Sequence, residues 1–384
     1  MPKATRFPDV TCRPEHTRGI RAVRGIATLV FALGLLPFIL PAHLPAQDRT
    51  LESFCSGAEI EFLGAEASCI ATAQAVTATQ PLLGILIAGG NPTLGTAGSA
   101  GLRLGLLPRS SAGVRLNVIG VRVPDILAEQ IGGEAGDLSR RLGVPVPAVT
   151  GDLSIGVFSG IDLAPGLGGI GRLSVLGSLT ALPFALLDSD GFDGADIAYG
   201  VGARLHLLDE SFIAPGVSFS VVRRTLPQVA FGDVCPSGLT AFAGAGGDTE
   251  VGACTSAGDR GEFSFDLTDW STRLVASKRL LGLGATVGIG HDSNDSDVGF
   301  GFRGSEPVQG SQVTPAFRIS GVDLDSTRWT AFGNLSFSIL VASVAAEAGW
   351  VQGDEPIGSF EELGSDFDPR EGSWYGSLGV RLSL

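Results

Sequence analysis

The last twelve residues of the chain, "SWYGSLGVRLSL" at Ser373–Leu384, alternate between apolar residues and small or polar ones. One side carries Trp374, Leu378, Val380 and Leu382, whereas the other carries mainly serine and glycine, with Arg381. A period of two residues is typical of a β-strand with one apolar and one polar face. Such a strand invites aggregation unless a protein core or a lipid bilayer covers its apolar face.

The same alternation recurs along the chain. It is found in "DLSIGVFSGIDL" at 152–163, "DIAYGVGARLHL" at 196–207, "LGLGATVGIG" at 281–290 and "WTAFGNLSFSI" at 329–339. A soluble β-sandwich or a transmembrane barrel could produce it. The second face holds mostly glycine and serine with isolated charges, which fits a barrel lumen better than an outer soluble surface. Lipid would then cover the apolar face, and the sheet must close because hydrocarbon cannot pair backbone groups.

The fold class predicted is therefore all-β: a closed antiparallel transmembrane barrel of about fourteen strands, or about twelve if the weakest candidates fail. Long connections at 124–150, 187–194, 227–261 and 353–372 all follow odd-numbered candidates, so they fall at one end of the barrel. The candidate strands are 82–90, 99–107, 112–123, 151–163, 171–186, 195–208, 212–226, 262–277, 280–290, 297–303, 312–321, 327–339, 341–352 and 373–384.

Residues 1–47 have the features of a secretory signal peptide. A basic stretch precedes the apolar run "GIATLVFALGLLPFIL", and small residues follow near Ala46. A membrane anchor is the alternative interpretation of this run. Export and a barrel together predict a location in the outer membrane. Residues 48–81 do not alternate and have helical propensity, so they form either a plug inside the barrel or a short periplasmic segment. Residues 82–384 form the predicted barrel.

Charge and composition exclude several functions. The chain has 26 Lys and Arg against 40 Asp and Glu, which makes nucleic acid a poor partner. No Cys or His pair has the spacing of zinc ligands, and neither a metal nor a cofactor is expected. In an oxidising compartment the natural disulfide pairing is local, Cys55 with Cys69 and Cys235 with Cys254, although other connectivities are possible.

The stretch "GGNPT" at 89–93 lies just before or within the first predicted hairpin. Together with an N-terminal plug and the predicted strands, it resembles the long-chain fatty-acid transporter family of outer-membrane barrels. That family has an Asn-Pro-Ala stretch in its plug, matched here by Asn91 and Pro92, whereas Thr93 departs from it. The resemblance implies passive uptake of small hydrophobic or amphipathic molecules.

Six charged residues fall on the small-residue faces of their strands, so they should point into the lumen. Charges at membrane depth must pair with one another or face water. Either they form a salt-bridge network that holds barrel and plug together, or they line a pathway that selects a solute by charge. The six are Arg103, Arg172, Arg204, Arg318, Glu347 and Arg381.

Acidic stretches at 188–196, 291–297 and 361–371 are interpreted as solvated loops, since none has the EF-hand spacing. One of them overlaps "GHDSN" at 290–294, which resembles the His-x-Ser-Asn stretch of outer-membrane phospholipases and lipid A deacylases. The resemblance implies that His291 is a base for Ser293, with both facing lipid. No residue that would orient His291 is evident, and a polar hairpin tip explains the stretch equally well.

The function predicted is passive uptake of a small-molecule solute across the outer membrane. The alternatives are an esterase or phospholipase that uses His291 and Ser293, and a surface or adhesion barrel that transports nothing. Besides the solute, the expected partners are outer-membrane lipid and the barrel-assembly machinery, which would engage the last strand at 373–384.

Overall fold

The computed structural model describes residues 80, 82–98, 109–120, 146–164, 168–182, 192–194, 197–232, 260–303, 316–353 and 371–383. The expected signal peptide and residues 48–79 lie outside these described residues. So do Cys55, Cys69, Cys235 and Cys254, and the two disulfides therefore stay predictions.

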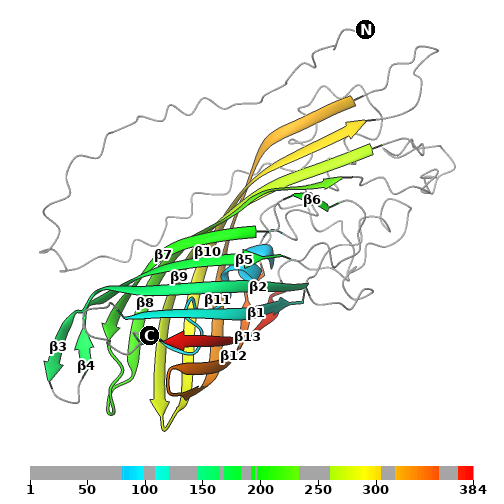
Figure 1. Cartoon of the computed structure of the whole chain (residues 1–384). Coiled ribbons are helices and arrows are strands. Elements are labelled where there is room, and N and C mark those ends of the chain that lie inside the picture. The colour runs from blue at the N-terminus through cyan, green and yellow to red at the C-terminus, as the bar shows by residue number, and fades with distance from the viewer. Residues whose placement is uncertain are drawn as a thin grey trace, which may run out of the picture.

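Ten antiparallel strands form a closed barrel (Figure 1). Each strand pairs with the next, and β13 pairs with β1 from Ser111↔Ser383 to Ile119↔Tyr375, which closes the ring. The wall strands are β1 (Ser110–Ile119), β2 (Val146–Phe158), β5 (Arg172–Ala181), β7 (Ile197–Leu208), β8 (Gly216–Gly232), β9 (Arg260–Leu280), β10 (Leu283–Arg303), β11 (Ala316–Ile339), β12 (Ala342–Val351) and β13 (Ser373–Ser383).

Three short strands complete the sheet elements. β3 (Ile161–Ala164) and β4 (Gly168–Ile170) form a hairpin between β2 and β5, and β6 (Phe192–Gly194) pairs with β8. The tight turns 281–282 and 340–341 lie at one end of the barrel, which we call the inner end. The connections after β1, β5, β8, β10 and β12 lie at the outer end, as the parity of the sequence predicts.

The predicted count of about fourteen strands is not supported. The candidates 280–290 and 297–303 belong to one strand, β10, and 312–321 and 327–339 both belong to β11. The polar residues 291–297, which the sequence places in a loop, belong to this strand. Residues 291–295 pair with both β9 and β11, and residues 296–297 pair with β11. Strands β8 to β11 continue beyond the other wall strands at the outer end (Figure 1).

The first candidate does not add to the wall. Residues 82–88, predicted within the strand 82–90, form a short helix inside the barrel. The apolar run "LLGILIA" has no polar residue at alternate positions, and in the lumen it can be apolar on all sides because the wall surrounds it. The candidate 99–107 lies outside the described residues.

A band of apolar side chains covers the outer surface of the wall. Examples are Val114, Leu179, Val287, Leu335 and Val380, all of which are at least half exposed. All four tryptophans of the chain also face outward, near the outer edge of this band: Trp270, Trp329, Trp350 and Trp374. Trp350 lies opposite Trp374, and such a belt is typical of the boundary between lipid and water.

Residues 82–98, called here the luminal segment, occupy the interior. Gly89 ends the helix with a φ of +62°, and its N–H donates to the carbonyl of Ile85 at 2.7 Å. Gly84 lies against the side chain of Asn294, beyond the outer ends of β12 and β13, whereas Gly98 lies near Glu210 at the inner end. The luminal segment therefore runs from the outer end of the lumen at Leu82 to the inner end at Gly98, and β1 also starts at the inner end.

Candidate functional site in the barrel lumen

The outer layer of the lumen is an apolar core. The helix contributes Leu82, Leu83, Ile85, Leu86 and Ile87, all buried. The wall contributes inward side chains that include Ile119, Leu226, Phe265 and Leu267. Burial of one such side chain stabilises the folded state by about 1.5–3 kcal/mol. The helix is therefore held in the lumen by the same hydrophobic packing as an element of a protein core.

Two arginines of the wall bind the carbonyl end of the helix. Arg115 of β1 donates to the carbonyls of Ala88 and Asn91, at 3.1 Å and 2.9 Å. Arg273 of β9 donates to the carbonyls of Gly89 and Gly90, at 3.1 Å and 2.9 Å. The last carbonyls of a helix lack partners within it and carry partial negative charge, which guanidinium groups complement.

Each of these buried arginines has a carboxylate beside it. Arg115 Nε lies 3.2 Å from Asp152 of β2, and Arg273 Nη1 lies 2.7 Å from Asp292 of β10. A third pair, Arg224 with Asp269, joins β8 to β9 at 3.4 Å. Pairing is what allows such charges to stay buried.

Asn91 is the residue of the luminal segment with the most hydrogen bonds. Its amide nitrogen donates to the carbonyl of Thr96 at 2.9 Å, which closes the turn of residues 91–96. Its amide oxygen accepts from the N–H of Thr93 at 3.2 Å and from Arg204 of β7 at 2.7 Å. Asn91 is fully buried, and these contacts fix its amide orientation.

Glu347 of β12 also binds the luminal segment, but it is an acceptor with a negative charge where the arginines are donors with a positive charge. Its carboxylate accepts from the N–H groups of Gly90 at 3.0 Å and Asn91 at 3.1 Å, and from the amide of Asn334 at 3.2 Å. Gly90 is needed for this approach, because a Cβ there would lie 2.6 Å from Glu347 Oε1. Glu347 therefore binds the backbone rather than a neighbouring cation.

The inner layer of the lumen binds residues 94–97 through polar side chains. Arg381 of β13 donates to the carbonyl of Leu94 at 2.9 Å, and Ser336 of β11 to that of Gly95 at 3.1 Å. Ser277 of β9 accepts from the N–H of Ala97 at 2.9 Å. Contacts thus reach the luminal segment from strands all around the wall.

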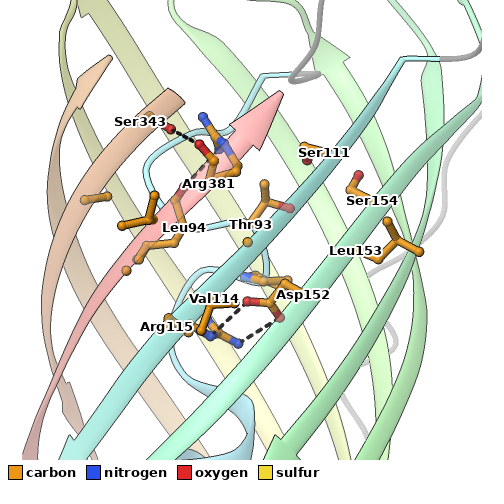
Figure 2. Close-up of a pocket in the computed structure, with 15 residues that line it drawn as sticks. Thr93, Leu94, Ser111, Val114, Arg115, Asp152, Leu153, Ser154, Ser343 and Arg381 are labelled. Carbon is orange, nitrogen blue, oxygen red and sulfur yellow. Dashed lines mark hydrogen bonds and ion pairs between the residues drawn. The ribbon is translucent and has the colours of Figure 1, made fainter. Parts of the chain in front are cut away.

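A small cavity remains beside the luminal segment (Figure 2). It lies between Thr93 and Leu94 on one side and strands β1, β2, β12 and β13 on the other. Its volume is about 20 Å³, and Arg115, Asp152 and Arg381 contribute to its lining. That volume suits about one water molecule, which the polar lining can bind.

The six predicted inward charges have different positions. Arg204, Glu347 and Arg381 converge on the luminal segment. Arg172 instead lies at the inner end, 2.7 Å from Asp209. The backbone of Arg318 is part of β11 but its side chain is not described, and Arg103 lies outside the described residues.

Arg115 and Arg273, which bind the carbonyl end of the helix, are not among the residues predicted from the sequence. Both were detectable from alternation, since Arg115 shares its face with Ser111 and Asn117, and Arg273 shares its face with Ser271. Asp152, Asp269 and Asp292 were detectable in the same way. The role of the two arginines was not detectable, because it depends on which carbonyls of the luminal segment lie opposite them.

His291 and Ser293 lie within β10 rather than at a hairpin tip. They face outward, as predicted, because Asp292 and Asn294 between and beside them are buried in the lumen. The His291 ring meets Trp329 edge to face, with centroids 5.1 Å apart. Ser293 lies opposite Trp270 in the adjoining strand. Their catalytic roles stay a prediction.

No helix among the described residues is long and apolar enough to cross a membrane. In the same part of the chain, no group of His, Cys, Asp or Glu is arranged to hold a metal ion.

No protein-family model matches this chain, and no curated protein is similar to it in sequence. Among solved structures it is similar to the outer membrane protease OmpT from Escherichia coli, at 11% identity and a TM-score of 0.32, over 72% of this chain and 94% of that one. The translocator domain of autotransporter NalP from Neisseria meningitidis gives 12% identity and a TM-score of 0.30, over 73% and 90% of the two chains. Ail of Yersinia pestis gives 9% identity and a TM-score of 0.24, over 73% and 100%.

The wall itself identifies the type of protein. It is closed, apolar toward the outside, belted by tryptophan and polar within, with tight turns at one end and longer connections at the other. These features are those of outer-membrane barrels. The chain is an outer-membrane β-barrel protein.

Proposed function

We propose that this barrel is an occluded membrane anchor that acts at its outer face and forms no open pore. The observation that carries the proposal is the luminal segment, which is bound by β1, β7, β9, β11, β12 and β13 together. Displacing it would expose the apolar helix and leave Arg115, Arg273 and Glu347 without their backbone partners. A hydrogen bond to a charged group contributes about 1.5–3 kcal/mol, so several such contacts oppose opening.

The outer face has the features of a recognition surface. Strands β9, β10 and β11 are 21, 21 and 24 residues long, against 10 for β1 and β12. Their outer parts extend past the ends of the shorter strands (Figure 1). The exposed residues there include Asp295, Asp297 and Asp325. A rigid projection that the membrane part holds outside the cell suits binding or adhesion.

Planar-bilayer recordings test the occlusion. The wild-type barrel is expected to show no conductance steps, whereas deletion of residues 82–98 should produce them. Val380→Ala on the lipid face is the matched control, and the heat-dependent gel shift of folded barrels shows whether each variant has folded. Steady conductance by the wild type would overturn the proposal.

The direction of the luminal segment gives a second test. Because it enters the lumen at the outer end, an epitope inserted ahead of Gln80 should bind antibody on intact cells. The same epitope in the turn 211–214, at the inner end, should bind only after the outer membrane is broken. The opposite labelling pattern would reverse the assignment of the outer end.

Uptake of small molecules is the second candidate, favoured by the irregular, glycine-rich backbone of residues 89–98, which could rearrange without unfolding a helix. A disulfide between Gly95→Cys and Ala345→Cys is a test, since a Cβ at Gly95 would lie 3.0 Å from that of Ala345. A shift of about 0.5 Å brings the two Cβ atoms into the range of a disulfide. If the barrel transports solute, the oxidised variant should lose uptake into liposomes and regain it on reduction. No uptake in either state excludes this candidate.

Ester hydrolysis is favoured only by the outward position of His291 and Ser293 near the tryptophan belt, where lipid ester groups lie. This hypothesis predicts that purified barrel cleaves phospholipid in mixed micelles and that Ser293→Ala abolishes cleavage. Equal activity of wild type and variant, or none in either, excludes it.

A further inference from the structure

An arginine lies on the lipid-facing side of the wall, at the level of the tryptophan belt. Arg223 of β8 is exposed and faces outward, since Val222 and Arg224 on either side of it are buried in the lumen. In the register of the sheet it lies opposite Val201 of β7 and Trp270 of β9. It is therefore surrounded by groups that face lipid.

Two aromatic residues flank this arginine. The guanidinium carbon lies 5.9 Å from the centre of the Trp270 ring, which is a cation–π contact. Tyr199 of β7 is also outward, half exposed, and opposite Thr225, which makes it the diagonal neighbour of Arg223. Diagonal neighbours are within reach of one another when their side chains are long.

No acidic residue in the described part of the chain pairs with Arg223. Its contact there is the cation–π contact with the Trp270 ring. Lys278, near the inner end, is different, because its ammonium donates to the carbonyls of Ser211 and Phe212 at 2.7 Å and of Ala214 at 3.3 Å. Among the described residues, the wall thus provides acceptors for the inner cation and none for the N–H donors of the outer one.

We propose that Arg223, Tyr199 and Trp270 form a binding site for the phosphate of an anionic lipid in the outer leaflet. Guanidinium presents paired donors that match a phosphate, while one of its faces contacts the indole. The Tyr199 hydroxyl supplies a further donor. Tryptophan marks the depth at which lipid headgroups lie, so the phosphate and the arginine meet at the same level. The site is independent of the luminal segment and of the proposed occlusion.

The test uses the full-length barrel in nanodiscs that contain phosphatidylcholine with a minor fraction of phosphatidylglycerol. Native mass spectrometry counts the phosphatidylglycerol molecules that stay bound to the barrel when it is released from the nanodisc. Wild type should retain phosphatidylglycerol, and Arg223→Gln should weaken retention about tenfold, as expected for loss of a charge-assisted hydrogen bond. Arg223→Lys should fall between them because it keeps the charge but not the paired donors.

Arg279→Gln is the matched control, since Arg279 is also an exposed cation but lies at the inner end. It should retain phosphatidylglycerol as the wild type does. Equal retention by Arg223→Gln and wild type would overturn the site, as would equal losses in Arg223→Gln and Arg279→Gln, which would indicate unspecific attraction of anionic lipid.

Discussion

The two faces of one wall strand differ in what their side chains contact, lipid on one side and the luminal segment on the other. On β13, Leu378 and Val380 point outward and are at least half exposed, whereas Ser377 and Arg381 point inward and are buried. The outward face needs only to be apolar, because lipid adapts to any shape. The inward face must match a particular partner, since Arg381 binds the carbonyl of Leu94 and Ser377 donates to Asn117 at 2.7 Å. Substitutions should therefore depend on shape and pairing inside, and on polarity and depth outside.

The largest effect is expected at Glu347. Glu347→Ala leaves two backbone N–H groups and the Asn334 amide without an acceptor and removes one negative charge from an arginine-rich lumen. Each buried donor left unpaired costs about 1–3 kcal/mol, so Glu347→Ala should lower the unfolding free energy by several kcal/mol, measured by denaturant titration in lipid vesicles. Glu347→Gln keeps an acceptor and should lose less. Equal stability of all three proteins would contradict the role given to this carboxylate.

On the outward face, the loss of unfolding free energy caused by a charged substitution should depend on its depth in the membrane. Leu378→Arg, in the middle of the apolar band, is expected to cost about 2–4 kcal/mol, and Leu382→Arg, near the inner edge, about 0–1 kcal/mol. Both leucines are about half exposed, at 58% and 49%, so burial in protein cannot explain a difference. The same titration measures both variants. Equal costs would mean that lipid does not cover this face as described.

Gly90 tests shape inside the lumen. A Cβ at this position would lie 2.5 Å from the Tyr375 hydroxyl and 2.6 Å from Glu347. Gly90→Ala should therefore cost about 1–3 kcal/mol through overpacking, and conductance should rise because the luminal segment is pushed from its place. Gly177→Ala, where a Cβ would meet nothing within 4 Å, is the control. If Gly90→Ala changes neither stability nor conductance, the luminal segment is not packed tightly at this position.

The smallest effect is expected beyond the membrane, where neither lipid nor lumen constrains the strands. Asp295 of β10 lies opposite Asp325 of β11 on the outward face. Both side chains are solvent-exposed and both make further interactions, so Asp295→Asn should change stability by less than about 0.5 kcal/mol in either direction. The change should shrink in high salt, which screens exposed charges. A loss of stability as large as that of Leu378→Arg would show that this part of β10 is constrained as the membrane part is.

The strand count shows where sequence reasoning failed. A local rule interprets Asp, Ser and Asn at 291–297 as a turn, but the structure pairs these residues in β10. The rule fails because a strand that leaves the membrane loses its apolar face and looks like a loop. The helix at 82–88 was predicted as a strand because it is apolar throughout. An apolar run resembles a buried strand when its surroundings are unknown.

The sequence alone determined which residues face lipid and which face inward, because alternation is a local property of an extended chain. It therefore predicted a closed barrel and placed Arg204, Glu347 and Arg381 on the inward side. Only the tertiary structure decided what these side chains bind. Arg204 and Asn91 are 113 positions apart and Gly90 and Glu347 are 257 apart, so their contacts exist only once the ring has closed around the luminal segment.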